Sequence, residues 1–224
     1  MKLTARWSHL RAVLFDLDGT LIDSAADLAA AANAMRVDRG LAALPLAQYR
    51  PHGGSGARGM LAQAFEIAPG EAGYDDLKRE FLDRYEGLMH DSTRPFDGIE
   101  AELLGLADGG LVWGIVTNKA ERFALPLAEA LGLAAGAIVG GDTTGHTKPH
   151  PAPLLEAARR LGVPPEACLY VGDDERDILA GRAAGMATAA ATWGYLGHSG
   201  EFRHWAADLE LSAPGELLKQ LGLA

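Results

Sequence analysis

Apolar runs that alternate with helical patterns constrain the fold of this chain more than any other feature. Helical segments with one apolar face lie between most of these runs. Strands that are apolar throughout and alternate with helices are typical of a parallel sheet covered on both faces. The sequence therefore predicts an α/β fold with a doubly wound, Rossmann-like parallel sheet. The expected strands lie at 11–16, 111–117, 137–141, 168–174 and 187–194, with 207–212 as a candidate sixth.

The interval 24–91 interrupts this alternation, because it holds helical patterns and no convincing strand. We expect an all-α helical cap domain inserted after the first strand, with the chain returning near Pro95 and Gly98. The next helix is predicted to be capped by Asp97. The expected domains are a catalytic core at 1–23 and 92–224 and a cap at 24–91, with cap helices at 24–40, 56–67 and 74–89.

Polar side chains follow four of the expected strands. Because a parallel sheet binds ligands outside the carboxyl ends of its strands, these groups are expected to share one site. They are Asp16 and Asp18 after the first strand, Thr117 and Asn118 after the second, Lys148 in the loop after the third, and Asp173, Asp174 and Asp177 after the fourth.

Carboxylates that converge at such an edge need a positive partner. Asp16, Asp18 and Asp173 would repel one another unless cations neutralised them. Lys148 supplies one positive charge, and a divalent metal would supply the rest. All-oxygen ligands favour Mg²⁺, and the Cys and His spacing of a zinc site is absent from the sequence.

This set of residues suits the hydrolysis of a phosphate monoester. Mg²⁺ and Lys148 would reduce the repulsion between the substrate dianion and an attacking carboxylate, while Thr117 and backbone N–H groups would hold the phosphoryl oxygens. Asp16 could attack phosphorus, and Asp18 could protonate the leaving alcohol and then activate water. Gly19 would let the backbone turn tightly beside them.

Four motifs in order make the chain resemble the haloacid dehalogenase-like phosphohydrolases: "FDLDGTLID" at 15–23, "VTNK" at 116–119, "KPHP" at 148–151 and "VGDDERD" at 171–177. The resemblance implies that Asp16 is the nucleophile and Asp18 the general acid and base. It also implies that Mg²⁺ binds Asp16, the backbone carbonyl of Asp18, and Asp173. Asp177 would act through a metal-bound water or through Lys148. Asp174 replaces a more usual Ser, so its role is open.

Within that family the chain is similar to the phosphoglycolate phosphatase group, and more closely to N-acetylmuramic acid 6-phosphate phosphatases. The stretches that carry this likeness are 35–42, 80–85, 111–119 and 194–211. It implies a small phosphate ester as substrate, with N-acetylmuramic acid 6-phosphate or 2-phosphoglycolate favoured.

Two features leave alternatives open. The Gly-rich segment 51–59 is either a flexible loop between helices or a specificity loop in which Arg58 or His52 contacts the leaving group. Asn118 either binds the phosphate or holds its own loop.

Other activities use similar residues. A sugar phosphomutase would use Asp16 and Asp18 but return the phosphoryl group to the sugar. A dehalogenase has no need of a second acid at Asp18. A phospho-accepting signalling module also combines acids, Thr and Lys on a parallel sheet, but such a module is about half this length and has no inserted cap.

Composition excludes few partners. The formal charge of −10 argues against nucleic acid or an anionic membrane surface as partner. The single cysteine, Cys168, precludes an internal disulfide and is expected to pack in the core. The sequence shows neither a secretory signal nor a membrane span, so we expect a cytoplasmic location. We also expect a monomer or a homodimer.

Overall fold

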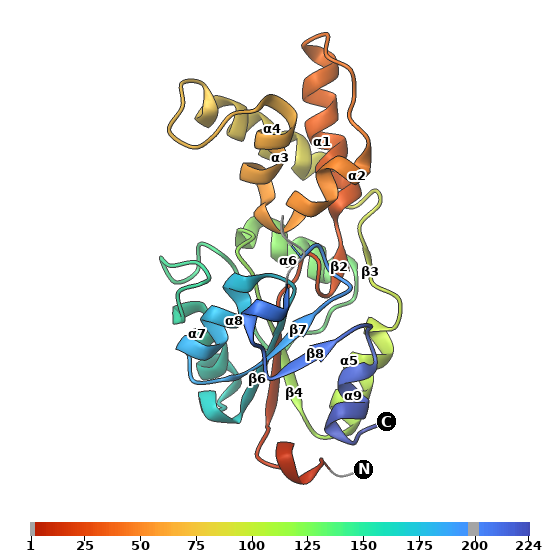
Figure 1. Ribbon diagram of the computed structural model, residues 1–224, viewed down its shortest axis with the longest axis vertical. Coiled ribbons are helices and arrows are strands. Elements are labelled where there is room, and N and C mark those ends of the chain that lie inside the picture. Colours follow the sequence, from red (N-terminus) through yellow and green to blue (C-terminus); the bar gives the residue numbers. More distant parts are fainter. Residues whose placement is uncertain (1–2, 197–201) are drawn as a thin grey trace.

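A six-stranded parallel sheet forms the centre of the molecule in the computed structural model, which describes residues 3–196 and 202–224 (Figure 1). The strand order is β5-β4-β1-β6-β7-β8, and each neighbouring pair is parallel. The predicted fold class is therefore confirmed, and 207–212 contributes the sixth strand. The strands are β1 (Ala12–Phe15), β4 (Val112–Val116), β5 (Ile138–Val139), β6 (Cys168–Gly172), β7 (Ala187–Ala191) and β8 (Leu209–Leu211).

Both faces of the central strand are buried, which explains its continuous apolar sequence. Val13 and Phe15 belong to the core cluster on one face, together with apolar residues of α5, α6 and α9. Ala12 and Leu14 belong to a second cluster with α7 and α8. The five helices are α5 (Ile99–Asp108), α6 (Glu121–Ala130), α7 (Ala152–Leu161), α8 (Glu175–Ala183) and α9 (Glu216–Leu221).

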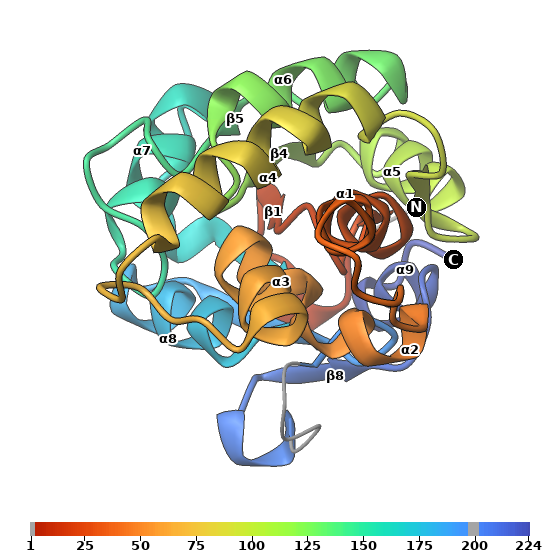
Figure 2. The same ribbon diagram turned by 90° about the horizontal axis from the view of Figure 1, so that it is seen from above.

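A separate helical layer lies over the carboxyl ends of the strands (Figures 1 and 2). Its buried side chains include Met35, Met60, Phe81 and Tyr85, which belong to the same apolar cluster as Val13 and Phe15. The sequence did not predict its short second helix or the 3₁₀ turn that follows. The layer contains α1 (Ala25–Asp38), α2 (Leu46–Tyr49), a 3₁₀ turn (Arg50–Ser55), α3 (Gly56–Phe65) and α4 (Tyr74–Leu88).

The chain enters and leaves this layer at one place. Strands β2 (Ile22–Asp23) and β3 (Arg94–Pro95) pair antiparallel, with Asp23 opposite Arg94. Buried Asp27 of α1 accepts hydrogen bonds from the backbone N–H and hydroxyl of Thr93, at 2.8 and 2.7 Å. The two ends of the helical layer are therefore held together.

The start of α5 corrects one expectation. Its N-cap residue is Gly98, with φ of +94°, and no side chain caps it, so the prediction that Asp97 caps this helix is wrong. The positive φ explains the choice of residue, because glycine adopts this conformation without a steric cost. Within the described part of the chain, no helix combines the length and apolar character needed to cross a membrane.

Candidate active site

Three neighbouring strands bring the predicted catalytic residues to one edge of the sheet. In the register of the sheet, Phe15 of β1 lies beside Ile115 of β4 and Val171 of β6. Asp16 therefore leaves β1 close to the ends of both neighbours, and its N–H donates to the Val171 carbonyl at 2.9 Å. Thr117 directly follows β4 and Asp173 directly follows β6.

Lys148 occupies the centre of this edge, with only 4% of its surface exposed. Its Nζ lies 2.7 Å from Asp16 Oδ1 and 2.8 Å from Asp177 Oδ1. Nζ also donates to the Val116 carbonyl at 3.0 Å and to the Tyr170 hydroxyl at 2.8 Å. Burial alone would lower the pKa of Lys148, but the two carboxylates raise it above its ordinary value. Lys148 is thus a fixed positive charge beside Asp16.

Three buried carboxylates cluster at the same edge of the sheet. Asp16, Asp173 and Asp177 each offer an oxygen, and these oxygens all lie within 4.8 Å of one another. Burial raises the pKa of Asp173 well above its ordinary value, and the charges of Asp16 and Asp177 raise it further. Burial likewise raises the pKa of Asp177 to about 7, although Lys148 opposes the shift.

The donor set of this cluster fits a hard divalent cation. All three side chains are carboxylates, and the cluster carries more negative charge than Lys148 alone can balance. The Asp173 carboxylate is oriented by the Tyr195 N–H at 2.8 Å and by the Thr20 hydroxyl at 3.0 Å. A metal ion could therefore be held by side chains that are already fixed in place.

Gly19 is needed where the chain passes this cluster. Its φ is +89°, and a Cβ at this position would lie 2.3 Å from Asp173 Oδ2. The tight turn expected at Gly19 is present, and the contact explains why no side chain fits there.

Asp18 lies outside the cluster of three carboxylates and has its own set of partners. The Ser24 hydroxyl donates to Asp18 Oδ1 at 2.5 Å, and Lys119 Nζ lies 3.2 Å from Asp18 Oδ2. Only 9% of the Lys119 side chain is exposed, and its Nζ donates to the Tyr85 hydroxyl of α4 at 3.0 Å. Burial would lower the pKa of Lys119, but Asp18 and Tyr85 raise it well above the ordinary lysine value.

Sequence reasoning missed Lys119 and Ser24. Lys119 ends the "VTNK" motif, directly after Thr117 and Asn118, and this adjacency was the available signal. Ser24 gave no such signal, since it follows β2 and precedes α1 as an ordinary helix-start residue would.

Asn118 uses both ends of its amide to hold the Lys148 loop. Its Nδ2 donates to the Lys148 carbonyl at 3.0 Å, and its Oδ1 accepts from the Lys148 N–H at 2.8 Å. Of the two roles left open by the sequence, this geometry favours loop support. Thr117 is 3% exposed, and its hydroxyl accepts from the Lys119 N–H at 3.1 Å.

Asp174 and Asp177 together begin helix α8. Asp174 accepts from the Arg176 N–H at 2.9 Å, while Asp177 Oδ2 accepts from the Asp174 N–H at 3.1 Å, which makes a reciprocal capping box. Asp177 therefore caps the helix with one oxygen and contacts Lys148 with the other. Arg176 also forms a two-pronged ion pair with Asp174, at 2.7 and 2.8 Å.

A cavity of about 620 Å³ lies between this edge and the helical layer. Asp16, Asp18, Thr117, Asn118, Lys148 and Asp177 line it from the core side. Of the two side chains predicted to contact a leaving group, Arg58 lines the cavity and is exposed. His52 lies in the 3₁₀ turn at 50–55, half-buried, and is not among the described residues that line the cavity.

Residues 13–191 match the family model of haloacid dehalogenase-like hydrolases, and the chain belongs to that family. The resemblance carried by the four motifs is thereby confirmed, although residues 197–201 of the stretch at 194–211 lie outside the described residues.

Two kinds of curated relatives are similar to the chain over most of its length. It is 50% identical over 210 residues to a phosphoglycolate phosphatase of Xanthomonas campestris, which covers 92% of this chain and 94% of that protein. It is 42% identical over 218 residues to an N-acetylmuramic acid 6-phosphate phosphatase of Pseudomonas aeruginosa, which covers 96% of each. Among solved structures, a predicted phosphoglycolate phosphatase from Haemophilus somnus superposes with a TM-score of 0.83 at 28% identity, covering 94% of this chain and 97% of that one.

Proposed function

We propose that this protein is a Mg²⁺-dependent phosphomonoesterase that acts on a small phosphorylated metabolite through an aspartyl-phosphate formed on Asp16. The observation that carries the proposal is the position of Asp16. It leaves the central strand, lies 2.7 Å from the Lys148 ammonium, belongs to a cluster of three carboxylates and lines the cavity. The phosphatase names of the two kinds of curated relatives support the same reaction.

The proposed ligands of Mg²⁺ are Asp16, Asp173 and the backbone carbonyl of Asp18, with Asp177 acting through water or through Lys148. Bound there, the ion would neutralise the carboxylates and offset the negative charge of the phosphate dianion. Lys148 contributes a second positive charge at the same point, which Asp177 and the Tyr170 hydroxyl hold in place.

The reaction has two steps, the formation and the hydrolysis of the aspartyl-phosphate. A carboxylate oxygen of Asp16 attacks phosphorus as the bond from phosphorus to the ester oxygen breaks, and Asp18 gives its proton to the leaving alkoxide. Asp18 then takes a proton from water as the water oxygen attacks the phosphorus of phospho-Asp16. The bond between phosphorus and the Asp16 carboxylate oxygen breaks, which releases inorganic phosphate and restores the Asp16 carboxylate. Ser24 and Lys119 orient Asp18 for both transfers.

The proposed domains share this work. The core at 1–23 and 92–224 carries the reacting groups, and the cap at 24–91 closes the cavity and contacts the leaving group through Arg58. The substrates we favour are N-acetylmuramic acid 6-phosphate and 2-phosphoglycolate. A cavity of about 620 Å³ has room for either ester.

The alternatives have less support. A phosphomutase would use the same acids, but the names of the relatives do not favour it. A signalling module does not account for the helical layer over the site. A cytoplasmic location, a monomer or homodimer, and the absence of nucleic-acid and membrane partners stay predictions from the sequence.

Phosphate release from a panel of esters, with and without EDTA, tests the proposal. We expect hydrolysis that EDTA abolishes and Mg²⁺ restores. A second readout needs no turnover: saturating Mg²⁺ should raise the melting temperature of the wild type, since at 100 times Kd a ligand stabilises the fold by about 2.7 kcal/mol. Asp173→Asn should lose most of that shift. A hydrolysis rate that EDTA does not change would contradict the role of the metal. So would a rise in melting temperature with Mg²⁺ that is as large in Asp173→Asn as in the wild type.

A further inference from the structure

The cations that the core contributes to the cavity wall already have acidic partners. Lys148 contacts Asp16 and Asp177, and Lys119 contacts Asp18. Arg122 of α6 lies 3.9 Å from Glu86, and Arg176 pairs with Asp174. These positive charges are balanced before any substrate enters.

Two cations that the helical layer contributes to the cavity wall have no acidic partner among the described residues. Arg58 of α3 and Lys78 of α4 line the same cavity and are exposed. Neither has an ion pair or a hydrogen bond with any residue that the structure describes. Unpaired positive charges on a cavity wall are free to bind an anion.

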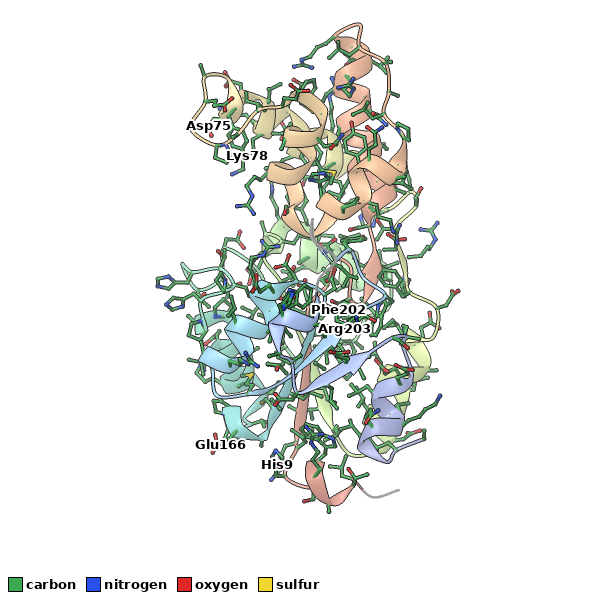
Figure 3. The ribbon with its side chains drawn as sticks, in the orientation of Figure 1. His9, Asp75, Lys78, Glu166, Phe202 and Arg203 are labelled. Carbon is green, nitrogen blue, oxygen red and sulfur yellow. The ribbon has the colours of Figure 1, made fainter. Side chains whose placement is uncertain are left out.

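Arg58 and Lys78 both come from the helical layer, and both line the cavity together with Tyr74, the first residue of α4. The charge of Arg58 opposes the rise that burial causes in the pKa of Tyr74, so Arg58 lies near the first residue of α4. Lys78 follows one turn later and lies at the end of the cap that overhangs the core (Figure 3). Asp75 also lines this wall but is paired with neither cation. The wall therefore keeps a net positive charge.

Apolar and aromatic side chains also line the cavity that contains Asp16 and these two cations. Phe81, Leu82 and Tyr85 of α4 line it together with Phe123 of α6. Such a surface suits the carbon skeleton of a leaving group, while the phosphate takes one end and a second anion the other.

We propose that Arg58 and Lys78 form a second anion site that binds a carboxylate carried by the leaving group. This proposal rests on the proposed phosphatase function and narrows its substrate to phosphate esters of acidic alcohols. Arg58 supplies a planar fork that matches a carboxylate, and Lys78 supplies a point charge.

A matched pair of substrates isolates the carboxylate. N-acetylmuramic acid 6-phosphate differs from N-acetylglucosamine 6-phosphate by one lactyl ether, which carries the acid group. The measured quantity is the ratio of kcat/KM for the acidic ester to kcat/KM for the neutral one. We expect a wild-type ratio well above one.

The variants Arg58→Gln and Lys78→Gln should each lower that ratio about tenfold, mainly through KM for the acidic ester. Arg58→Glu should lower it further, because it places a like charge beside the carboxylate. Arg58→Lys should retain part of the preference. Arg79→Gln is the matched control, since Arg79 is the next residue of α4, pairs with Asp76 at 3.2 Å and does not line this cavity.

The outcomes separate the two proposals. Hydrolysis of both esters with a wild-type ratio near one, or with a ratio that the Arg58 and Lys78 variants leave unchanged, would overturn the second anion site and leave the phosphatase intact. No phosphate release from any ester by the wild type with Mg²⁺ would overturn the phosphatase itself. Melting curves of each variant confirm that the exposed substitutions leave the protein folded.

Discussion

Arg176 Nη2 donates a hydrogen bond of 2.8 Å to the carbonyl oxygen of Gly54, and so joins helix α8 of the core to the 3₁₀ turn of the helical layer. The same guanidinium is held by Asp174, which caps α8. Next to this contact, a Cβ on Gly53 would lie 2.6 Å from the Tyr195 ring. The 3₁₀ turn therefore rests on the core at a position fixed by the helix that also carries Asp177.

Arg176→Ala should loosen this contact. The variant removes a charge-assisted hydrogen bond, so we expect KM for the preferred ester to rise about tenfold. Hydrogen exchange at residues 50–59 should become faster. Arg160→Ala is the control, because Arg160 pairs with Glu156 on α7, outside the cavity. Unchanged exchange in Arg176→Ala would show that the turn is held by other contacts.

Asp16→Asn should abolish turnover and leave the fold intact. The amide cannot act as the nucleophile, so we expect a loss on the order of 10³-fold or more in kcat. In the absence of metal its melting temperature should equal or exceed that of the wild type, because Asp173 and Asp177 lose a repelling neighbour. Phosphate release and thermal denaturation measure the two effects. Activity above a few per cent would contradict covalent catalysis by Asp16.

Lys119→Met should lower kcat/KM about a hundredfold, since it removes a preorganised positive charge beside Asp18. Methionine has a similar length, so the buried stem keeps its packing. Lys219→Met on α9 is the matched control, because Lys219 is exposed and does not line the cavity. Equal kinetics for the two variants would leave Lys119 with a structural role alone.

Glu102 gives the stability a dependence on pH away from the active site. It is buried on α5, and its Oε2 accepts from the Gly215 N–H at 2.6 Å. Burial raises the pKa of Glu102 above 4.5, although the backbone hydrogen bonds oppose this. The folded state thus holds the proton more tightly than the unfolded state. The contribution of Glu102 to stability is full below pH 4.5 and is lost as the pH rises through the folded value.

Glu102→Gln should therefore lose less stability than the wild type between pH 4 and pH 8. Urea denaturation at several pH values measures the difference. Glu100→Gln, on an exposed position of the same helix, should follow the wild type. Parallel curves for all three proteins would show that Glu102 is ionised without penalty.

Groups at strand ends could be predicted from the sequence because their places follow from the sheet alone. Asp16, Thr117 and Asp173 each come directly after a strand, and parallel strands share an edge. Lys148 was placed there because its loop follows the expected third strand, and its burial follows from contacts with strands β4 and β6.

Partnerships between distant segments could not be predicted in this way. The pairing of Lys119 with Asp18 and Tyr85 needs the relative positions of β4, β1 and α4, which no local pattern records. The same holds for Arg176 and Gly54, which lie 122 residues apart in the chain. Asp97 shows the opposite failure, because a suitable capping residue was present and the positive φ of Gly98 made the turn without it.

The antiparallel pair β2 and β3 has a consequence for how such proteins diversify. Because Asp23 lies opposite Arg94, the segment 24–93 leaves the core and returns to it at one point. A donor segment from a relative that keeps Ser24 and Tyr85, the partners of Asp18 and Lys119, could be inserted at this point without disturbing the strand ends. The part of the protein that contacts the leaving group could then change in one step, while the reacting carboxylates of the core stay the same.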